Sequence, residues 1–328
     1  MNKKLIALAV AAVASTSVSA AEVFNDGTSS LSIGGRIEAR ALLVDGDMDD
    51  KSRARMNILG QTEIAENVYG FGFFEHEYTT TEDEVRYGFA GISTEFGKMA
   101  YGKTDGSLGM ITDFTDIMAY HGAGASSKIA VADRIQNNLA YMGEFGGLTV
   151  KANYVGETEA LDGTLIVDGG YSMGAVYAME NGLAMGLGYA DQGKDAVVVI
   201  DKKAVQAKAE SQIEAAVSYT MGDIYVAALY KDGEEKKAGQ TTDLTGYEFA
   251  AAYTMGQTTF STTYNKAEEK AGSDKSNTYD AIAIDATHYF NDNFRAYTSY
   301  NFNLLDANEV KTKKDAEDQL VFGLRYDF

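Results

Sequence analysis

Two closely spaced carboxylates, Asp113 and Asp116, stand in a stretch that follows no regular pattern, between Tyr101 and Arg134. Paired carboxylates could act as a general acid and a general base, but no nucleophile or further base accompanies them at a suitable spacing. None of the histidines fits a zinc-ligand or HExxH spacing; they are His76, His121 and His288. These residue types therefore predict no enzymatic activity, no metal site and no cofactor.

Arginines recur on the polar side of several alternating stretches of the chain. The six are Arg36, Arg40, Arg53, Arg55, Arg86 and Arg134. Like charges crowded on one wall repel each other unless anions or a facing acidic group offset them. Asp113 and Asp116 are the expected counterparts, with Asp105 and Asp133 near the ends of the same stretch. The alternative is that these arginines are solvated strand charges that share no common field.

The elements that must position these residues are strands, because period-2 alternation of apolar and polar residues dominates the chain. In the last ten residues large apolar side chains alternate with mostly polar or small ones up to Tyr326 and Phe328. Sixteen strands are expected, with ends near 31–44, 53–65, 68–80, 85–94, 97–104, 130–143, 147–157, 169–180, 183–191, 211–220, 223–231, 244–255, 257–267, 278–290, 294–305 and 317–328.

The connections between these strands are of two kinds. Short turns of the pattern Tyr-Thr-Met-Gly recur at Tyr219–Gly222 and Tyr253–Gly256, with looser copies elsewhere. The opposite connections are expected to be long polar loops, at 45–52, 157–168, 192–210, 232–243, 267–277 and 306–317. Short turns at one end and long charged loops at the other predict an up-and-down meander.

Composition narrows the class of protein. Residues 1–20 read as a secretory signal peptide, with Lys3 and Lys4 before an apolar run and a cleavage site at Val18-Ser19-Ala20. Removing those two lysines changes the formal net charge from −20 to −22, and such acidity argues against a nucleic-acid partner. The absence of Cys excludes disulfides and thiol chemistry. The absence of Pro suits an extensive sheet, and no later segment approaches the ~18 apolar residues of a spanning helix.

Two all-β architectures compete for this pattern. A soluble sandwich rarely continues through sixteen strands, whereas a membrane barrel places its apolar face outward and its polar face in the lumen. Tyrosines at the strand ends favour the barrel, because aromatic girdles lie at the membrane interfaces; they are Tyr177, Tyr189, Tyr219, Tyr253, Tyr264, Tyr289 and Tyr300. We therefore expect one domain, residues 21–328, folded as a transmembrane 16-stranded antiparallel up-and-down β-barrel.

Several ordered motifs over the whole mature length resemble the general diffusion porins of Gram-negative outer membranes, and most closely the OmpU-type porins. The motifs are Gly34-Gly35-Arg36, Ser52-Arg53-Ala54-Arg55-Met56, Arg86-Tyr87-Gly88-Phe89-Ala90-Gly91, Tyr101-Gly102-Lys103, Asp113-Phe114-Thr115-Asp116-Ile117-Met118, Ile129-Ala130-Val131-Ala132-Asp133-Arg134, Phe302-Asn303-Leu304-Leu305-Asp306 and Gly323-Leu324-Arg325-Tyr326-Asp327-Phe328.

The resemblance implies a homotrimer of barrels in the outer membrane, in contact with its lipid and lipopolysaccharide. It implies that the third external loop, residues 105–127, folds inward as a constriction loop and sets acids against a basic ladder. The ladder positions are Arg36, Arg55, Arg86 and Arg134, and Asp116 matches a loop acid. Tyr120 stands where general diffusion porins carry a second loop acid. The ending Tyr326 to Phe328 matches the signal that the barrel-assembly machinery reads.

These expectations define a passive, water-filled channel for ions and small hydrophilic solutes. The acidic loops and loop tip should raise the cation concentration at the mouth, which predicts a mild preference for cations. The alternative function is a surface adhesin or receptor barrel that binds a ligand through its external loops.

Overall fold

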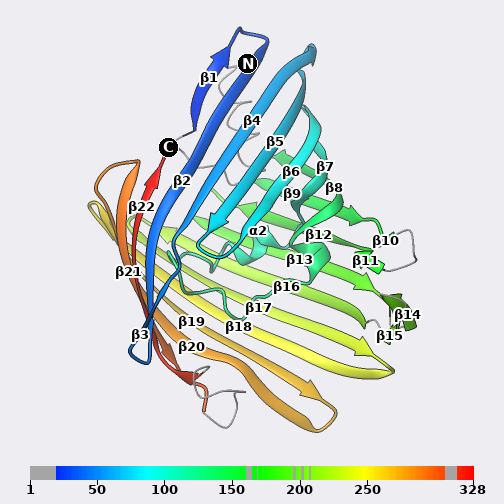
Figure 1. Cartoon of the computed structure of the whole chain (residues 1–328), viewed down its shortest axis with the longest axis vertical. Coiled ribbons are helices and arrows are strands. Elements are labelled where there is room, and N and C mark those ends of the chain that lie inside the picture. Colours follow the sequence, from blue (N-terminus) through cyan, green and yellow to red (C-terminus); the bar gives the residue numbers. More distant parts are fainter. Residues whose placement is uncertain are drawn as a thin grey trace.

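The structure is a computed structural model that describes residues 20–159, 165–167, 169–194, 197–200, 203–206, 208–306 and 316–328. Within these residues, sixteen antiparallel strands form one closed wall (Figure 1). They are β2 (Ser29–Val44), β4 (Arg53–Ala65), β5 (Val68–Thr79), β6 (Asp83–Thr94), β7 (Gly97–Asp105), β8 (Arg134–Phe145), β9 (Leu148–Val155), β12 (Gly170–Ala178), β13 (Leu183–Gly193), β16 (Lys208–Met221), β17 (Ile224–Lys237), β18 (Gln240–Met255), β19 (Thr258–Ala271), β20 (Asp274–Tyr289), β21 (Phe294–Asn303) and β22 (Gln319–Asp327). The predicted 16-stranded barrel is confirmed.

The wall closes between its first and last strands. β22 pairs antiparallel with β2 from Arg36 opposite Asp327 to Val44 opposite Gln319. Below this ladder the Phe328 carbonyl accepts a hydrogen bond from the Gly35 N–H at 2.9 Å, and the Phe328 N–H donates to the Gly35 carbonyl at 3.0 Å. Closure satisfies the backbone groups that a sheet edge would leave unpaired in lipid.

Shorter elements extend or fill the barrel. Strand β1 (Ala21–Asn25) pairs with the first residues of β2 and is exposed along its length, so it prolongs the wall. β3 (Asp47–Asp50) folds back on the far end of β2, and two hairpins stand among the long connections, β10 (Thr158–Glu159) with β11 (Leu165–Val167) and β14 (Val197–Ile200) with β15 (Lys203–Gln206). The helix α2 (Gly109–Thr112) and the 3-10 turn η1 (Ala130–Ala132) belong to the connection between β7 and β8.

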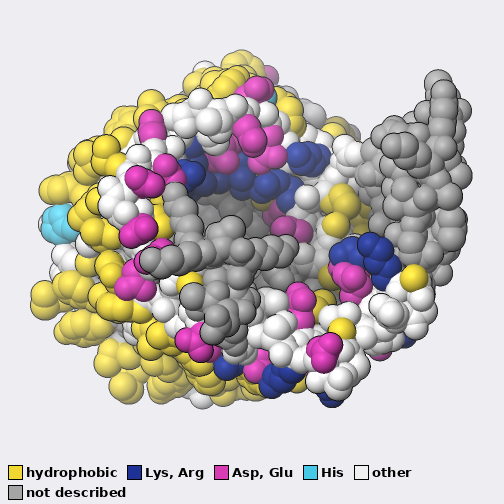
Figure 2. Space-filling model, turned by 60° about the horizontal axis from the view of Figure 1, so that its bottom comes forward, with side chains coloured by type: hydrophobic (Ala, Val, Ile, Leu, Met, Phe, Trp, Pro, Cys, Tyr) yellow, Lys and Arg dark blue, Asp and Glu magenta, His cyan; other side chains and the backbone are white. Residues whose placement is uncertain are grey.

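The two faces of the wall differ as the alternation predicts. On β2 the side chains of Ile37 and Ala39 are exposed on the outside, whereas Glu38 and Arg40 are buried on the inside. Figure 2 shows the yellow apolar outer surface beside a hollow lined by charged side chains. No helix in the described part of the chain is long and apolar enough to cross a membrane.

Some expected boundaries are wrong. The connections predicted as long loops at 232–243 and 267–277 are continued strands, which end in tight turns at Ala238-Gly239 and Gly272-Ser273. Both faces of these extensions are polar because they rise beyond the apolar band, so alternation disappears while pairing continues. A cross-strand ion pair within the second of these extensions joins Lys275 to Glu268 at 2.9 Å. The strand predicted from residue 130 begins at Arg134, because η1 precedes it.

The predicted signal peptide lies outside the described residues except for Ala20.

Candidate functional site

The connection from Gly106 to Asp133, here called the inner loop, leaves the wall after β7 and folds into the barrel, where α2 lies within its outline (Figure 1). Its first half is anchored by apolar side chains. Leu108 and Ile111 are fully buried, and Phe114 is nearly so. They pack against the inner face of β12 to β17, where Gly186 and Gly188 lack the side chains that would collide with them. The inner loop therefore has a hydrophobic foundation on one side of the lumen.

Buried polar side chains of the wall hold both halves of the inner loop. Glu248 on β18 accepts hydrogen bonds from the Thr115 hydroxyl and, at 2.9 Å, from the Ala125 N–H. Gln212 on β16 accepts from the Ile129 N–H at 3.1 Å. These bonds satisfy loop backbone groups that are buried away from bulk water. They fix both limbs of the inner loop to the wall.

The tip of the inner loop reaches the opposite part of the barrel. Tyr120 places its ring 4.7 Å from the Arg40 guanidinium on β2. His121 Nδ1 lies 2.8 Å from Ser299 Oγ, and its Nε2 lies 3.3 Å from Gln319 Oε1. Burial lowers the pKa of His121, and the Arg40 charge lowers it further, although the Gln319 contact opposes the shift. His121 is therefore neutral at pH 7 and acts as a structural bridge.

A cavity of about 380 Å³ separates the inner loop from the basic part of the wall. Asp116 lines it from the loop, and four arginines line it from β2, β4, β21 and β22: Arg36, Arg53, Arg295 and Arg325. Figure 2 shows Lys and Arg side chains gathered on one inner wall of the hollow, with Asp and Glu around the mouth. The structure thus brings Asp116 and Arg36 to one cavity, from elements far apart in sequence.

The wall arginines are paired with wall carboxylates. Glu38 contacts Arg40 at 2.8 Å and Arg53 at 2.7 Å, and Arg40 also donates through Nε to the Tyr297 hydroxyl at 2.8 Å. Glu77 accepts from Arg55, lies 3.6 Å from Arg53 and lies 3.6 Å from Arg86. Glu75 accepts from Arg86 Nε at 2.9 Å. Four guanidinium groups therefore share three carboxylates on their own wall.

Arg36 makes no ion pair with a carboxylate among the described contacts, unlike the four arginines just named. Its Nε is buried and has no hydrogen-bond partner among the described residues. It lies in register opposite Arg55 on β4 and Asp327 on β22, and it lines the cavity with Asp116. Its charge is therefore the least compensated of the predicted ladder.

Asp113 lies apart from the arginines. The charges that act on it most strongly are those of Asp116, Lys128, Asp105 and Lys151, and it does not line the cavity of Arg36. Its side chain is exposed to lumen water, but the enclosing protein limits its hydration. This enclosure raises the pKa of Asp113 to about 6, helped by the Asp116 charge and opposed by Lys128. The pKa of Asp116 is also raised by its surroundings, against the attraction of Lys128.

The residues at the base of the inner loop form a separate cluster. The Tyr87 hydroxyl lies 2.9 Å from both carboxylate oxygens of Asp105, and the Arg134 guanidinium lies 5.3 Å from the Tyr87 ring centre. Arg134 also contacts Glu84 at 3.4 Å. Arg134 and Asp105 thus secure the loop base and are not residues of the cavity described above.

Sequence reasoning missed several members of this site. Glu38 could have been found, because it shares the parity of Arg36 and Arg40 on β2. Glu75 and Glu77 likewise share the inward parity of β5. Arg295 and Arg325 alternate correctly for the lumen. The pairing of β21 with β22, together with that of β22 with β2, brings them beside Arg36. Within the described residues, no group of three or more His, Asp or Glu side chains is placed to hold a metal ion.

Comparison with known proteins gives consistent matches. A family model described as Gram-negative porin matches residues 7–308. The chain is 50% identical to porin-like protein L of Photobacterium profundum and 47% identical to outer membrane protein U of Vibrio vulnificus, with 100% of both chains covered in each alignment. Among solved structures, the fold superposes on OmpF of Salmonella typhi with a TM-score of 0.78 at 21% identity, over 94% of this chain and 100% of that chain.

Proposed function

Because this chain belongs to the family of Gram-negative porins, we propose that it forms a passive, water-filled channel with a mild preference for cations. Its solutes are ions and small hydrophilic molecules. The observation that supports the proposal is the lumen cavity, which Asp116 of the inner loop shares with Arg36, Arg53, Arg295 and Arg325 of the wall. The protein resides in the outer membrane, as its relatives do.

The preference for cations rests on how the wall charges are compensated. Arg40, Arg53, Arg55 and Arg86 are neutralised in large part by Glu38, Glu75 and Glu77 at contact distance. A paired guanidinium has a weak field a few ångströms away, because the two opposite charges screen each other. Asp116 has no ion-pair partner of this kind among the described contacts at its side of the cavity. Of the four cavity arginines, Arg36 is the one without a carboxylate partner among the described contacts. It is opposed by two loop carboxylates, Asp113 and Asp116, and this balance favours cations.

The net charge of the whole protein also favours cations. Its formal net charge is −20, which includes two lysines of the predicted signal peptide. Acidic residues at a channel mouth raise the local concentration of cations and lower that of anions. We extend the proposal to removal of residues 1–20 and to a homotrimer of barrels formed by residues 21–328, as the family resemblance implies.

Reversal potentials in planar bilayers across a salt gradient test the selectivity. In Asp116→Asn the permeability ratio of potassium to chloride should fall by up to about fivefold, since a unit charge at ~4 Å in water-like surroundings contributes about 1 kcal/mol. Asp292→Asn, which removes one exposed charge in the turn between β20 and β21, is the matched control and should leave the ratio unchanged. A wild-type channel that carries more anion current, or an unaltered ratio in Asp116→Asn, contradicts the proposal.

The same recordings address the alternative receptor function. An open porin conducts in large steps, grouped by three when a trimer inserts, whereas a plugged receptor barrel conducts little. Solutes of graded size added to the bath then give the size limit of the channel. Absence of stepwise conductance in correctly folded protein would favour the receptor.

A further inference from the structure

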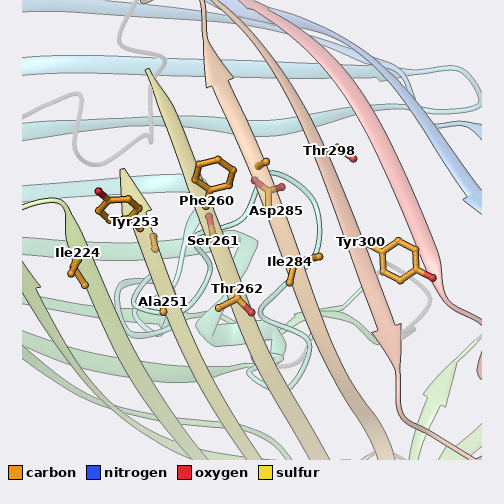
Figure 3. A pocket seen from close by; sticks show the side chains of 12 residues that line it. Ile224, Ala251, Tyr253, Phe260, Ser261, Thr262, Ile284, Asp285, Thr298 and Tyr300 are labelled. Atoms are coloured by element: carbon orange, nitrogen blue, oxygen red, sulfur yellow. The ribbon is translucent and has the colours of Figure 1, made fainter. Parts of the chain in front are cut away.

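The outer surface of the barrel has a hollow of about 600 Å³ that the channel function does not use (Figure 3). It spans β17 to β21 and faces away from the lumen. Its walls include Tyr253, Phe260 and Ile284, whose side chains are 48%, 45% and 48% exposed. These three large apolar side chains project from three neighbouring strands around a depressed floor, in the direction that the membrane occupies.

The hollow results from the sizes of outward side chains in adjacent rows of the sheet. Small residues form its floor: Ala251 opposite Thr262, and Ala286 opposite Thr298. The next row toward the long loops is bulky throughout, with Phe249, Tyr264, Ile282 and Phe302 in register. Small side chains beneath and beside large ones leave a step in the surface that the protein itself does not fill.

The lining of the hollow is mostly apolar. The Thr262 hydroxyl, which faces outward, donates to the Ala283 carbonyl of the neighbouring strand at 2.9 Å. A hydroxyl satisfied in this way presents mainly its methyl group to the hollow, as is required of a surface in contact with hydrocarbon. The chemistry of the hollow therefore matches an alkyl chain and disfavours a sugar or a phosphate.

The depth of the hollow identifies the leaflet. Tyr253 and Phe260 lie two residues from the ends of β18 and β19 at their short turn. In outer-membrane barrels the short turns are periplasmic and the long loops are extracellular. The hollow thus lies in the half of the membrane that borders the periplasm, away from the long connections.

We propose that this hollow is a binding site for one acyl chain of a periplasmic-leaflet phospholipid. The acyl chain lies over Ala251 and Ala286 and is flanked by Tyr253, Phe260 and Ile284. Association in lipid depends on close packing, because hydrocarbon gains no hydrophobic free energy by leaving hydrocarbon. A surface step that fits a chain holds that chain longer than a flat surface does, through the dispersion contacts of both walls.

Native mass spectrometry of the full chain tests this proposal. The protein is reconstituted with dioleoyl phosphatidylethanolamine, extracted in mild detergent and scored for retained phospholipid. Ala286→Phe should lower the retained fraction about threefold or more, because the added ring occupies the space that a close-packed chain would fill. Ala215→Phe is the matched control, an outward alanine of β16 between the large side chains of Leu187 and Tyr230.

A second variant and a second lipid complete the experiment. Ala251→Leu is a milder filling of the same floor and decides the question if Ala286→Phe fails to fold, as judged by conductance. A second reconstitution with lipid A tests the phosphorylated glycolipid of the other leaflet. Equal phospholipid retention in wild type, the filled variants and the control overturns the proposal, and so does retention of lipid A in preference to phospholipid.

Discussion

Tyr120 determines how the tip of the inner loop meets the basic wall. Its ring lies 4.7 Å from the Arg40 guanidinium, which remains paired with Glu38 and with the Tyr297 hydroxyl. A ring face attracts a guanidinium by about 0.5–2 kcal/mol, depending on desolvation. A carboxylate at this position would compete with Glu38 for Arg40, whereas the ring adds bulk without adding charge. Tyr120 thus affects the size of the constriction, whereas other residues set its charge.

Replacement of Tyr120 should therefore alter conductance more than selectivity. We expect Tyr120→Ala to raise single-channel conductance, because a large side chain is lost from a lining position of the cavity. Tyr120→Phe retains the ring and should match wild type within roughly 0.5 kcal/mol in stability, as most conservative surface changes do. Bilayer recordings and thermal unfolding of both variants provide the measurement. Unchanged conductance in Tyr120→Ala would show that the ring does not limit the pore.

The loop carboxylates predict a dependence of selectivity on pH. The pKa of Asp113 is raised to about 6, so this carboxylate gains a proton in mildly acidic solution. The pKa of Asp116 is also raised, by burial and against the attraction of Lys128. Protonation removes negative charge from the constriction, so cation preference should be complete above pH 7 and decrease as the pH falls through about 6. Asp113→Asn should abolish the upper part of this transition. A permeability ratio that stays constant down to pH 5 would contradict the assignment.

At the scale of elements, the inner loop depends on wall residues that lie far from it in sequence. Glu248 joins both of its limbs, through the Thr115 hydroxyl and the Ala125 N–H. Glu248 is fully buried, so a substitution cannot be compensated easily by bulk water. A constriction of defined size needs this restraint, because a loop free at its second limb would sample several pore diameters.

Glu248→Ala should loosen the inner loop without unfolding the barrel. The Ala125 N–H loses its acceptor, and a buried donor left unsatisfied costs about 1–3 kcal/mol. The Thr115 hydroxyl keeps only its long contact of 3.4 Å to the Thr112 carbonyl. We expect larger fluctuations of the open-channel current and a lower unfolding temperature. Glu248→Gln keeps a carbonyl oxygen for the Ala125 N–H and should behave much more like wild type. Equally quiet channels in wild type and Glu248→Ala would show that the apolar anchors Leu108 and Ile111 suffice.

Alternation predicted the barrel strands because lipid and lumen impose opposite polarities on neighbouring residues. The prediction failed where that contrast ends. Beyond the apolar band, β17 to β20 continue with polar side chains on both faces, and the pattern alone could not distinguish them from loops. The start of β8 was misplaced for a related reason, since the apolar residues of η1 face the inner loop and its supporting wall.

At the scale of the whole molecule, the candidate site forms only when the barrel closes. The inward positions of Arg36, Arg53 and Arg55 followed from parity within single strands. The neighbours of these arginines could not be predicted from parity, because Arg325 reaches Arg36 across the seam between β22 and β2. Asp113 was expected beside the arginines but lies near Lys128 and Lys151, as the fold of the inner loop decides. Sequence pattern therefore predicted which side chains face the lumen, and topology decides which of them meet.

The pairing of β22 with β2 gives a prediction that distinguishes the stability of the closed barrel from its assembly in cells. Phe328 is joined to Gly35 by two backbone hydrogen bonds of 2.9 and 3.0 Å, which Phe328→Ala preserves. In Gly35→Ala the new methyl group would meet the Arg55 carbonyl oxygen and approach the Phe328 ring to 2.7 Å. Such overpacking costs about 1–3 kcal/mol. The two variants therefore disturb different properties, one the ring that the assembly machinery is proposed to read and the other the ladder.

We expect protein refolded in detergent to unfold at a lower temperature in Gly35→Ala, measured by the mobility of unheated samples on gels. Phe328→Ala should unfold near the wild-type temperature in the same assay but reach the outer membrane of cells in reduced amount. If Phe328→Ala assembles in cells as well as wild type, the terminal ring is not a recognition signal. If it is instead unstable after refolding, the ring acts through packing on Gly35 and Tyr326, whose ring centre lies 6.4 Å away.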